Sequence, residues 1–174
     1  MRQLLMSAVE NVLKREENKY ALNLITGAGH DQRKKPHKIE NWLQVEVAKE
    51  LDRPENSKVV SDIVVEASNL DIVAMHHANG EKRRIAIELK IGSEATEVQG
   101  DLVKLREAKN GYFLFLQLLL TIDKPRKTYA EELLAREPMK LLLEYERQLM
   151  DHRYIRADEG DEYQWYLAIG CVQI

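Results

Sequence analysis

The dipeptide Asn79-Gly80 constrains the fold of this chain more than any other feature. It separates two runs with the character of β-strands, and Asn-Gly favours a two-residue hairpin loop because both turn positions require positive φ. A loop of this length determines how the two strands pair, and it places Asp71 directly opposite Glu88. The Cβ atoms of such facing residues lie about 4.5–5.5 Å apart. Lys90, two residues beyond Glu88, points from the same face of its strand.

Two carboxylates that face each other repel, so this hairpin needs a positive charge to neutralise them. A divalent cation would do so, and oxygen ligands at this separation suit Mg²⁺ or Mn²⁺, which keep several waters for a substrate phosphate. Lys90 would then contact the phosphate, or help to orient and deprotonate the attacking water. A Glu-x-Lys pattern alone would favour a solvated surface pair, but the apolar neighbours Val73, Met75 and Ala86 on the same face favour partial burial. The hairpin therefore predicts phosphodiester hydrolysis.

The rest of the chain reads as helices and strands around this hairpin. Apolar residues at helical spacing predict helices, whereas alternating or continuous apolar runs predict strands. One helix opens at Thr96 and stops at Asn110-Gly111. The other expected helices are 2–17, 38–52, 129–136 and 138–152, and the expected strands are 58–67, 70–77, 83–91, 112–122 and 163–174.

The almost unbroken apolar run at 112–122 is typical of a strand buried on both faces. Because a helix connects it to the strand at 83–91, we expect the two strands to be parallel. The order of elements predicts one domain over residues 1–174, of the α/β class with a mixed sheet. A compact α-β-β-β-α-β unit follows an N-terminal helix and precedes C-terminal helices and a final strand.

The charge balance excludes a protein that coats nucleic acid through bulk positive charge. Lys and Arg total 26 against 29 Asp and Glu, a formal net charge of −3, so any site for a polyanion must be local. The single cysteine, Cys171, cannot form an internal disulfide, which indicates a reducing compartment. No secretory signal opens the chain, and its longest apolar run is much shorter than the roughly 20 residues that span a bilayer. We expect a soluble, cytoplasmic protein without a membrane partner.

This arrangement resembles the PD-(D/E)XK nuclease superfamily. Asp71 is followed after sixteen residues by Glu88-Leu89-Lys90 at the end of an Asn-Gly hairpin, with a Glu-bearing helix before it and a helix and an apolar strand after it. The resemblance covers residues 38–122 and implies a restriction-endonuclease-like core. It departs from the motif at Leu70, which stands where the family name has proline. The resemblance implies that Asp71, Glu88 and the backbone carbonyl of Leu89 bind Mg²⁺ or Mn²⁺, and that Lys90 is the catalytic lysine.

The family often adds a glutamate from the preceding helix. We prefer Glu40, which has apolar residues at +3, +7 and +11. Glu46 lies within the apolar arc of the same helix and is its rival, and either could instead be a boundary glutamate that reaches water. On the following helix, Gln99 resembles a glutamine that several branches of the family place beside the site, but it also completes a capping box with Thr96.

Further charged residues are candidates for completing the site and for contacting the substrate. Asp101 and Lys104 lie on the buried side, or at its edge, of the helix after the third strand, and either could complete the site. We expect DNA rather than RNA as the substrate, contacted by nearby basic residues, namely Lys82, Arg83, Arg84 and the segment 33–38. The competing function is a catalytically inactive module of the same fold that binds a protein partner or nucleic acid. Its first helix and C-terminal helices would then form a homodimer or partner interface.

Overall fold

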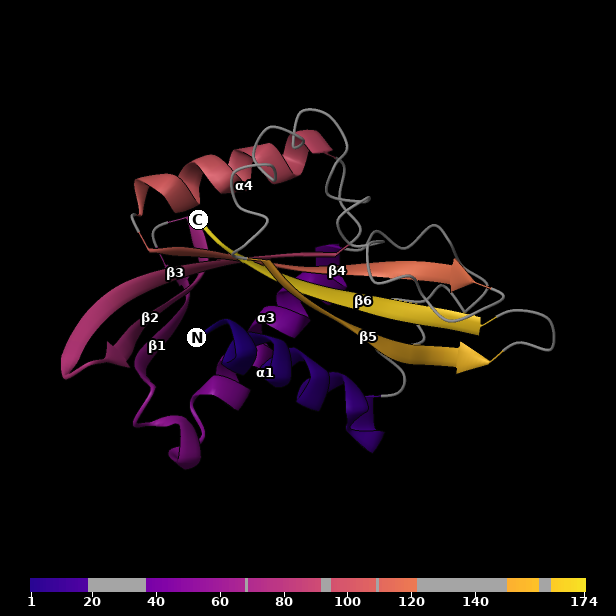
Figure 1. Ribbon diagram of the computed structural model, residues 1–174, viewed down its shortest axis with the longest axis horizontal. Helices are drawn as coiled ribbons and strands as arrows, with labels where there is room; N and C mark the ends of the chain where they lie inside the picture. The colour runs from indigo at the N-terminus through magenta and orange to yellow at the C-terminus, as the bar shows by residue number, and fades with distance from the viewer. Residues whose placement is uncertain (19–36, 68, 92–94, 109, 122–149, 160–163) are drawn as a thin grey trace.

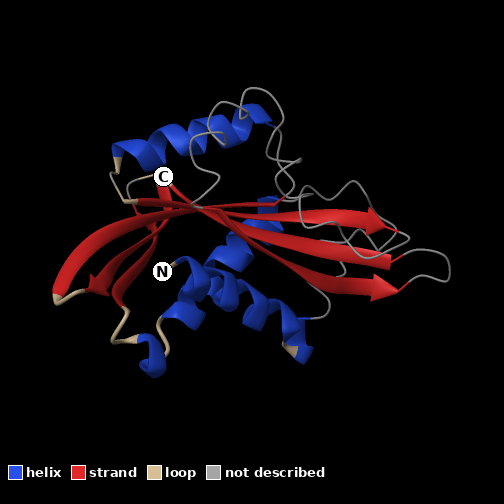
Figure 2. Ribbon diagram, viewed as in Figure 1, coloured by secondary structure: helices blue, strands red, loops and turns tan. Residues whose placement is uncertain are grey.

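A computed structural model of the chain has an α/β fold in which helices lie on both faces of one mixed β-sheet (Figures 1 and 2). It describes residues 1–18, 37–67, 69–91, 95–108, 110–121, 150–159 and 164–174. The sheet has six strands in the order β1-β2-β3-β4-β6-β5. The expected α/β class with a mixed sheet is therefore confirmed.

The elements of this fold have the following bounds. The described α-helices are α1 (Arg2–Lys14), α3 (His37–Leu51) and α4 (Ala95–Glu107). Short 3₁₀ helices span Glu16–Asn18 and Pro54–Asn56. The strands are β1 (Val60–Ala67), β2 (Leu70–Ala78), β3 (Glu81–Ile91), β4 (Gly111–Thr121), β5 (Met150–Glu159) and β6 (Gln164–Gln173). Within these residues, none of the helices combines the length and apolarity needed to cross a bilayer.

The hairpin of β2 and β3 has the register expected from its turn. Asn79-Gly80 forms the turn, and both residues have positive φ, 53° and 78°. The antiparallel ladder runs without a shift from the turn to the pair of Ile72 and Ile87. Asp71 and Glu88 are the next facing positions, so the predicted register is confirmed.

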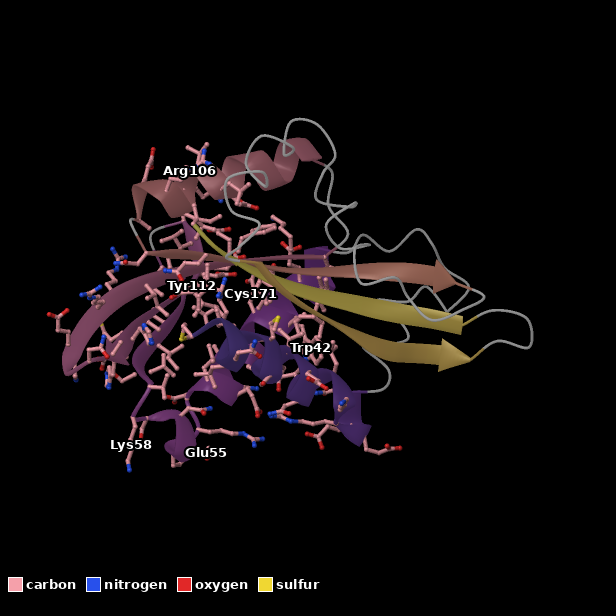
Figure 3. The ribbon with its side chains drawn as sticks, in the orientation of Figure 1. Trp42, Glu55, Lys58, Arg106, Tyr112 and Cys171 are labelled. Carbon is pink, nitrogen blue, oxygen red and sulfur yellow. The ribbon has the colours of Figure 1, made fainter. Side chains whose placement is uncertain are left out.

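The crossover from β3 to β4 also matches its prediction. Strand β4 pairs with β3 in parallel, and α4 makes the connection across one face of the sheet (Figure 1). The side chains of Tyr112, Phe113, Leu114 and Leu116 are all buried, as expected for a central strand covered on both sides. Tyr112 and the buried thiol of Cys171 lie near each other on β4 and β6 (Figure 3).

Helices α1 and α3 pack on the sheet face opposite α4 (Figure 1). Alternate residues of β3 point into this layer and join the core, which also takes Leu5 and Val9 from α1 and Leu43 and Val47 from α3. The β3 residues in the core are Ile85, Ile87, Leu89 and Ile91. The intervening residues of β3, which include Glu88 and Lys90, therefore point from the face that carries α4.

The C-terminal prediction is partly wrong. The expected helix at 138–152 cannot extend to its predicted end, because Met150–Glu159 forms the edge strand β5, which pairs antiparallel with β6. Charged residues interrupt any two-residue apolar period in this segment, as is common in edge strands, so the sequence did not signal a strand. The expected helix at 129–136 and the start of the other lie outside the described residues. The final strand is β6, close to its predicted bounds.

The start of α4 also differs from the expectation. The helix begins at Ala95, so Thr96 lies inside its first turn instead of preceding it as the cap of a capping box. The side chain of Gln99 lies outside the described part of the chain, and its proposed place beside the site stays a prediction.

The close approach of α4 to β4 requires a glycine at position 111. A Cβ atom at Gly111 would lie 2.6 Å from Cβ of Leu105 and 2.9 Å from its carbonyl oxygen. We expect Gly111→Ala to lower the free energy of unfolding by about 1–3 kcal/mol, because backbone must move to relieve the overlap. Urea denaturation measures this change. Gly100→Ala is the matched control on α4, where nothing lies within 4 Å of an added Cβ, and it should stabilise by about 0.5–1 kcal/mol. Equal effects of the two substitutions would contradict the proposed packing.

Candidate active site

Acidic and basic side chains from four elements meet beside the ends of β2 and β3 that lie away from the hairpin turn. We call this group the carboxylate–lysine cluster. It consists of four carboxyl groups and two ammonium groups, from Glu40, Asp71, Glu88, Asp101, Lys90 and Lys104.

Asp71 and Glu88 come from the paired strands and lie close enough for their charges to interact. The Oδ2 atom of Asp71 accepts a hydrogen bond of 2.7 Å from the backbone N–H of Leu89. This bond ties the side chain of β2 to the backbone of β3 and holds Asp71 beside the neighbouring Glu88. Glu88 itself is only 1% exposed. The register of the hairpin thus brings the two carboxyl groups together in a largely buried place.

Lys90 lies between carboxylates from helices on opposite faces of the sheet. Its Nζ is 3.2 Å from Oε1 of Glu40 on α3 and 3.2 Å from Oδ2 of Asp101 on α4. The other oxygen of Glu40, Oε2, accepts a hydrogen bond of 3.2 Å from the backbone N–H of Ile91, the last residue of β3. Glu40 therefore joins the N-terminal part of α3 both to the end of β3 and to the ammonium group of Lys90.

The rival glutamate on α3 lies elsewhere. Glu46 forms ion pairs with Arg15, at 3.5 Å, and with the exposed Lys49, at 2.6 Å. These contacts help to join α3 to the end of α1, where Glu50 also pairs with Arg15. The structure brings Glu40 to Lys90, and it does not bring Glu46 there.

Lys104 adds a second ammonium group from α4. Its Nζ lies 2.8 Å from Oδ1 of Asp101, one turn away on the same helix, and 3.8 Å from Oε2 of Glu88. Its side chain is 44% exposed, so the cluster opens to solvent on this side. Sequence reasoning placed Asp101 and Lys104 near the site but did not find their contacts with Lys90 and Glu88. The i, i+3 spacing of the two residues was the available signal for their own ion pair.

One oxygen of Glu88 has no hydrogen-bond donor among the described residues. Its Oε1 atom is buried and receives no hydrogen bond from any described residue. A buried carboxylate oxygen without a donor is costly, so this position favours either a proton on Glu88 or a cation beside it. With every group ionised, the four carboxylates and two ammonium groups of the cluster leave an excess of two negative charges, which equals the charge of one divalent cation.

The environment of the cluster changes the pKa values of its members. Burial, together with the charges of Asp71 and Asp101, raises the pKa of Glu88 to about 8. Burial raises the pKa of Asp71 to about 6, although the hydrogen bond from Leu89 and the charge of Lys90 act in the opposite direction.

The pKa values of the two lysines are also raised, but for a lysine a raised pKa favours the charged form. Burial acts to lower the pKa of Lys90, but the carboxylates of Glu40 and Asp101 outweigh it and raise this pKa above its usual value. The hydrogen bond to Asp101 likewise raises the pKa of Lys104. Both groups are therefore ammonium ions at neutral pH.

These features fit a divalent cation in composition and charge, since Asp71 and Glu88 supply oxygen ligands of the kind that Mg²⁺ and Mn²⁺ prefer. The unpartnered Oε1 atom of Glu88 points to the same need for positive charge. Among the described residues, however, no group of three or more His, Cys, Asp or Glu side chains has the arrangement to hold a metal ion as it stands. Lys90 and Lys104 neutralise part of the negative charge in this arrangement.

Two further predictions concern the basic segment at 33–38 and the backbone carbonyl of Leu89. Residues 33–36 and the side chains of residues 37 and 38 lie outside the described part of the chain, so the expected basic segment at 33–38 stays a prediction. Leu89 lies next to Glu88 on β3, and its side chain is fully buried on the opposite face. A role of its carbonyl oxygen as a metal ligand also stays a prediction.

Comparison of the chain with protein-family models, with curated proteins and with solved structures found no match. The geometry and chemistry of the cluster therefore carry the functional inference.

The raised pKa of Glu88 predicts how stability depends on pH in metal-free buffer. Between its ordinary pKa of 4.5 and the folded value of about 8, the folded protein retains a proton that the unfolded chain releases. We expect the free energy of unfolding to fall as pH rises through this window, by on the order of 2–4 kcal/mol. Glu88→Gln, which keeps the shape of the protonated acid, should flatten this dependence and be more stable than the wild type at pH 8.

Urea denaturation between pH 5 and pH 8, with EDTA present, measures this dependence. Glu107→Gln changes an exposed residue of α4 and should leave the profile unchanged. A Glu88→Gln variant that is less stable than the wild type at pH 8 would show that the buried group is ionised and paired instead.

Proposed function

We propose that this protein is a metal-dependent nuclease of the PD-(D/E)XK type that hydrolyses phosphodiester bonds in DNA. The observation that carries the proposal is the meeting of Asp71, Glu88 and Lys90 beside Glu40 in one largely buried cluster. The consecutive elements α3, β1, β2, β3, α4 and β4 support a restriction-endonuclease-like core, because they have the order α-β-β-β-α-β with a parallel final pair.

In this proposal Asp71 and Glu88 hold Mg²⁺ or Mn²⁺, with the backbone carbonyl of Leu89 as a further ligand. When bound, the ion supplies Lewis-acid polarisation of the phosphodiester and promotes ionisation of water at neutral pH. The N–H group of Leu89 orients Asp71 through the hydrogen bond to Oδ2. The chain thereby presents two acidic side chains whose separation depends on the backbone pairing of β2 and β3.

Lys90 acts as a cation in this mechanism. Because Glu40 and Asp101 raise its pKa, Lys90 is protonated at neutral pH and is poorly suited to remove a proton from water. Its ammonium group instead contacts a phosphate oxygen and stabilises the negative charge that develops there. Glu40 positions Lys90, since it accepts hydrogen bonds from both Nζ of Lys90 and the backbone of Ile91.

We expect the purified protein to cleave DNA when Mg²⁺ or Mn²⁺ is present and to lose this activity after Lys90→Ala. The substitution removes the ammonium group that stabilises the phosphate, and loss of one such electrostatic contact lowers kcat by about 10²–10³-fold. A gel assay with labelled DNA measures the rate. Lys49→Ala is the control, because Lys49 is an exposed lysine that pairs with Glu46 away from the cluster. Unchanged cleavage after Lys90→Ala would refute the assigned site.

A second pair of variants tests which glutamate of α3 belongs to the site. Glu40→Gln should lower kcat because the variant can no longer hold Lys90 with a charged group, whereas Glu46→Gln should keep the wild-type rate. The pH dependence of kcat provides a readout that a purely structural defect would not change. Glu40→Gln should shift its alkaline limb to lower pH, since Glu40 raises the pKa of Lys90. Equal rates for the two variants would contradict the placement of Glu40.

Metal binding is measurable without activity. At 100 times its dissociation constant, Mn²⁺ should raise the Tm at pH 8 by about 5–10 °C. The increase should be smaller at pH 5, where protons on Glu88 and Asp71 compete with the ion. Asp71→Asn should remove the increase, and Glu46→Gln should retain it. Metal binding and DNA binding without cleavage would instead favour the catalytically inactive module.

A further inference from the structure

The three consecutive basic residues of β3 point from two different faces of the sheet. Side chains alternate along a strand, so Lys82 and Arg84 share the face of Glu88 and Lys90. Arg83 points from the opposite face, in line with the core residue Ile85. All three basic side chains are exposed. Strand β3 therefore carries one continuous face that begins with basic residues near the hairpin turn and ends at the carboxylate–lysine cluster.

The charge of Arg83 is already neutralised, whereas that of its neighbours is available. The guanidinium group of Arg83 donates two hydrogen bonds, of 3.0 and 2.6 Å, to Oε2 of Glu81. In the described parts of the chain, neither Lys82 nor Arg84 pairs with an acidic side chain. The two residues on the cluster side thus offer exposed positive charge, although the protein as a whole has a net charge of −3.

The spacing of these residues suits an extended polyanion that runs from the cluster along β3. A strand rises about 3.3 Å per residue, so Arg84 lies about 13 Å from Glu88 along β3 and Lys82 about 20 Å from it. Both distances fall within one turn of duplex DNA, which is about 34 Å long. Hydrogen bonds between the backbones of β2 and β3 extend to the turn and hold the conformation of this part of β3.

We infer that Arg84 and Lys82 form a phosphate-binding track for DNA, and that Arg83 does not belong to it. The inference rests on the proposed function, because it takes DNA as the substrate of the cluster. Each of the two residues contacts one backbone phosphate and positions the strand so that another phosphate reaches Lys90. Such contacts do not distinguish one base sequence from another, and they add affinity because they release counterions from the DNA.

The test measures binding of a short fluorescent DNA duplex by anisotropy, with Ca²⁺ in place of Mg²⁺, over a series of salt concentrations. Arg84→Ala and Lys82→Ala should each weaken binding and lower the slope of log Kd against log salt by about 0.9, the value for one lost phosphate contact. Arg84→Lys keeps the charge and should restore the wild-type slope. Because the altered side chains are exposed, the variants should fold, and circular dichroism checks that they do.

Arg83→Ala is the matched control, with the same charge change one residue away, and it should leave Kd and the slope unchanged. Lys49→Ala is a second control, since this exposed lysine lies on α3, on the opposite face of the sheet (Figure 1), and pairs with Glu46. Equal effects of Arg83→Ala and Arg84→Ala, or unchanged slopes for both Arg84→Ala and Lys82→Ala, would overturn the track. If the wild type still cleaves DNA and Lys90→Ala does not, only the track fails. If the wild type neither binds nor cleaves DNA, the proposed function fails with it.

Discussion

The burial of Glu88 beside Asp71 is the interaction on which the rest of the candidate site depends. An acid that is 1% exposed, with one oxygen that receives no hydrogen bond from the described residues, needs a proton or a positive charge close by. The two ammonium groups of the cluster supply positive charge beside Glu88 and Asp71. Lys104 approaches Glu88 from α4, and Lys90 extends from the same strand face between two further carboxylates. Without these cations the paired strands would bring two like charges together at a cost to folding.

This electrostatic balance also joins the two helical layers. Glu40 comes from α3 on one face of the sheet and Asp101 from α4 on the other, and both contact Nζ of Lys90. A residue at the end of a strand can be reached from both faces, whereas a residue in the middle of the sheet is shielded by its neighbouring strands. The end of β3 is therefore the place where the fold can gather charges from both layers. A change in either helix position would alter the environment of the same ammonium group.

The features that local chemistry determines were predictable from the sequence. The Asn79-Gly80 turn specifies its own geometry and so the register that pairs Asp71 with Glu88. The choice between Glu40 and Glu46 was harder because both lie near the apolar arc of one helix. Tertiary contacts separate them, because Arg15, directly after α1, pairs with Glu46, whereas Lys90 pairs with Glu40. The edge strand β5 escaped prediction because its pairing with β6 supplies its backbone hydrogen bonds, while its charged sequence has no clear period.

Acidic and basic groups are separated along β3, so the net charge of −3 does not describe the charge that a polyanion meets at this strand. Acidic groups are concentrated where burial and helix packing hold them, and exposed basic groups lie farther along the same face of the strand. A polyanion approaching the whole molecule meets weak repulsion, yet one aligned with β3 meets positive charge before it reaches the carboxylates. Under the proposed function, this arrangement would favour one orientation of a nucleic-acid strand over general adhesion, because the proposed contacts form only where phosphates match the spacing of Arg84 and Lys82.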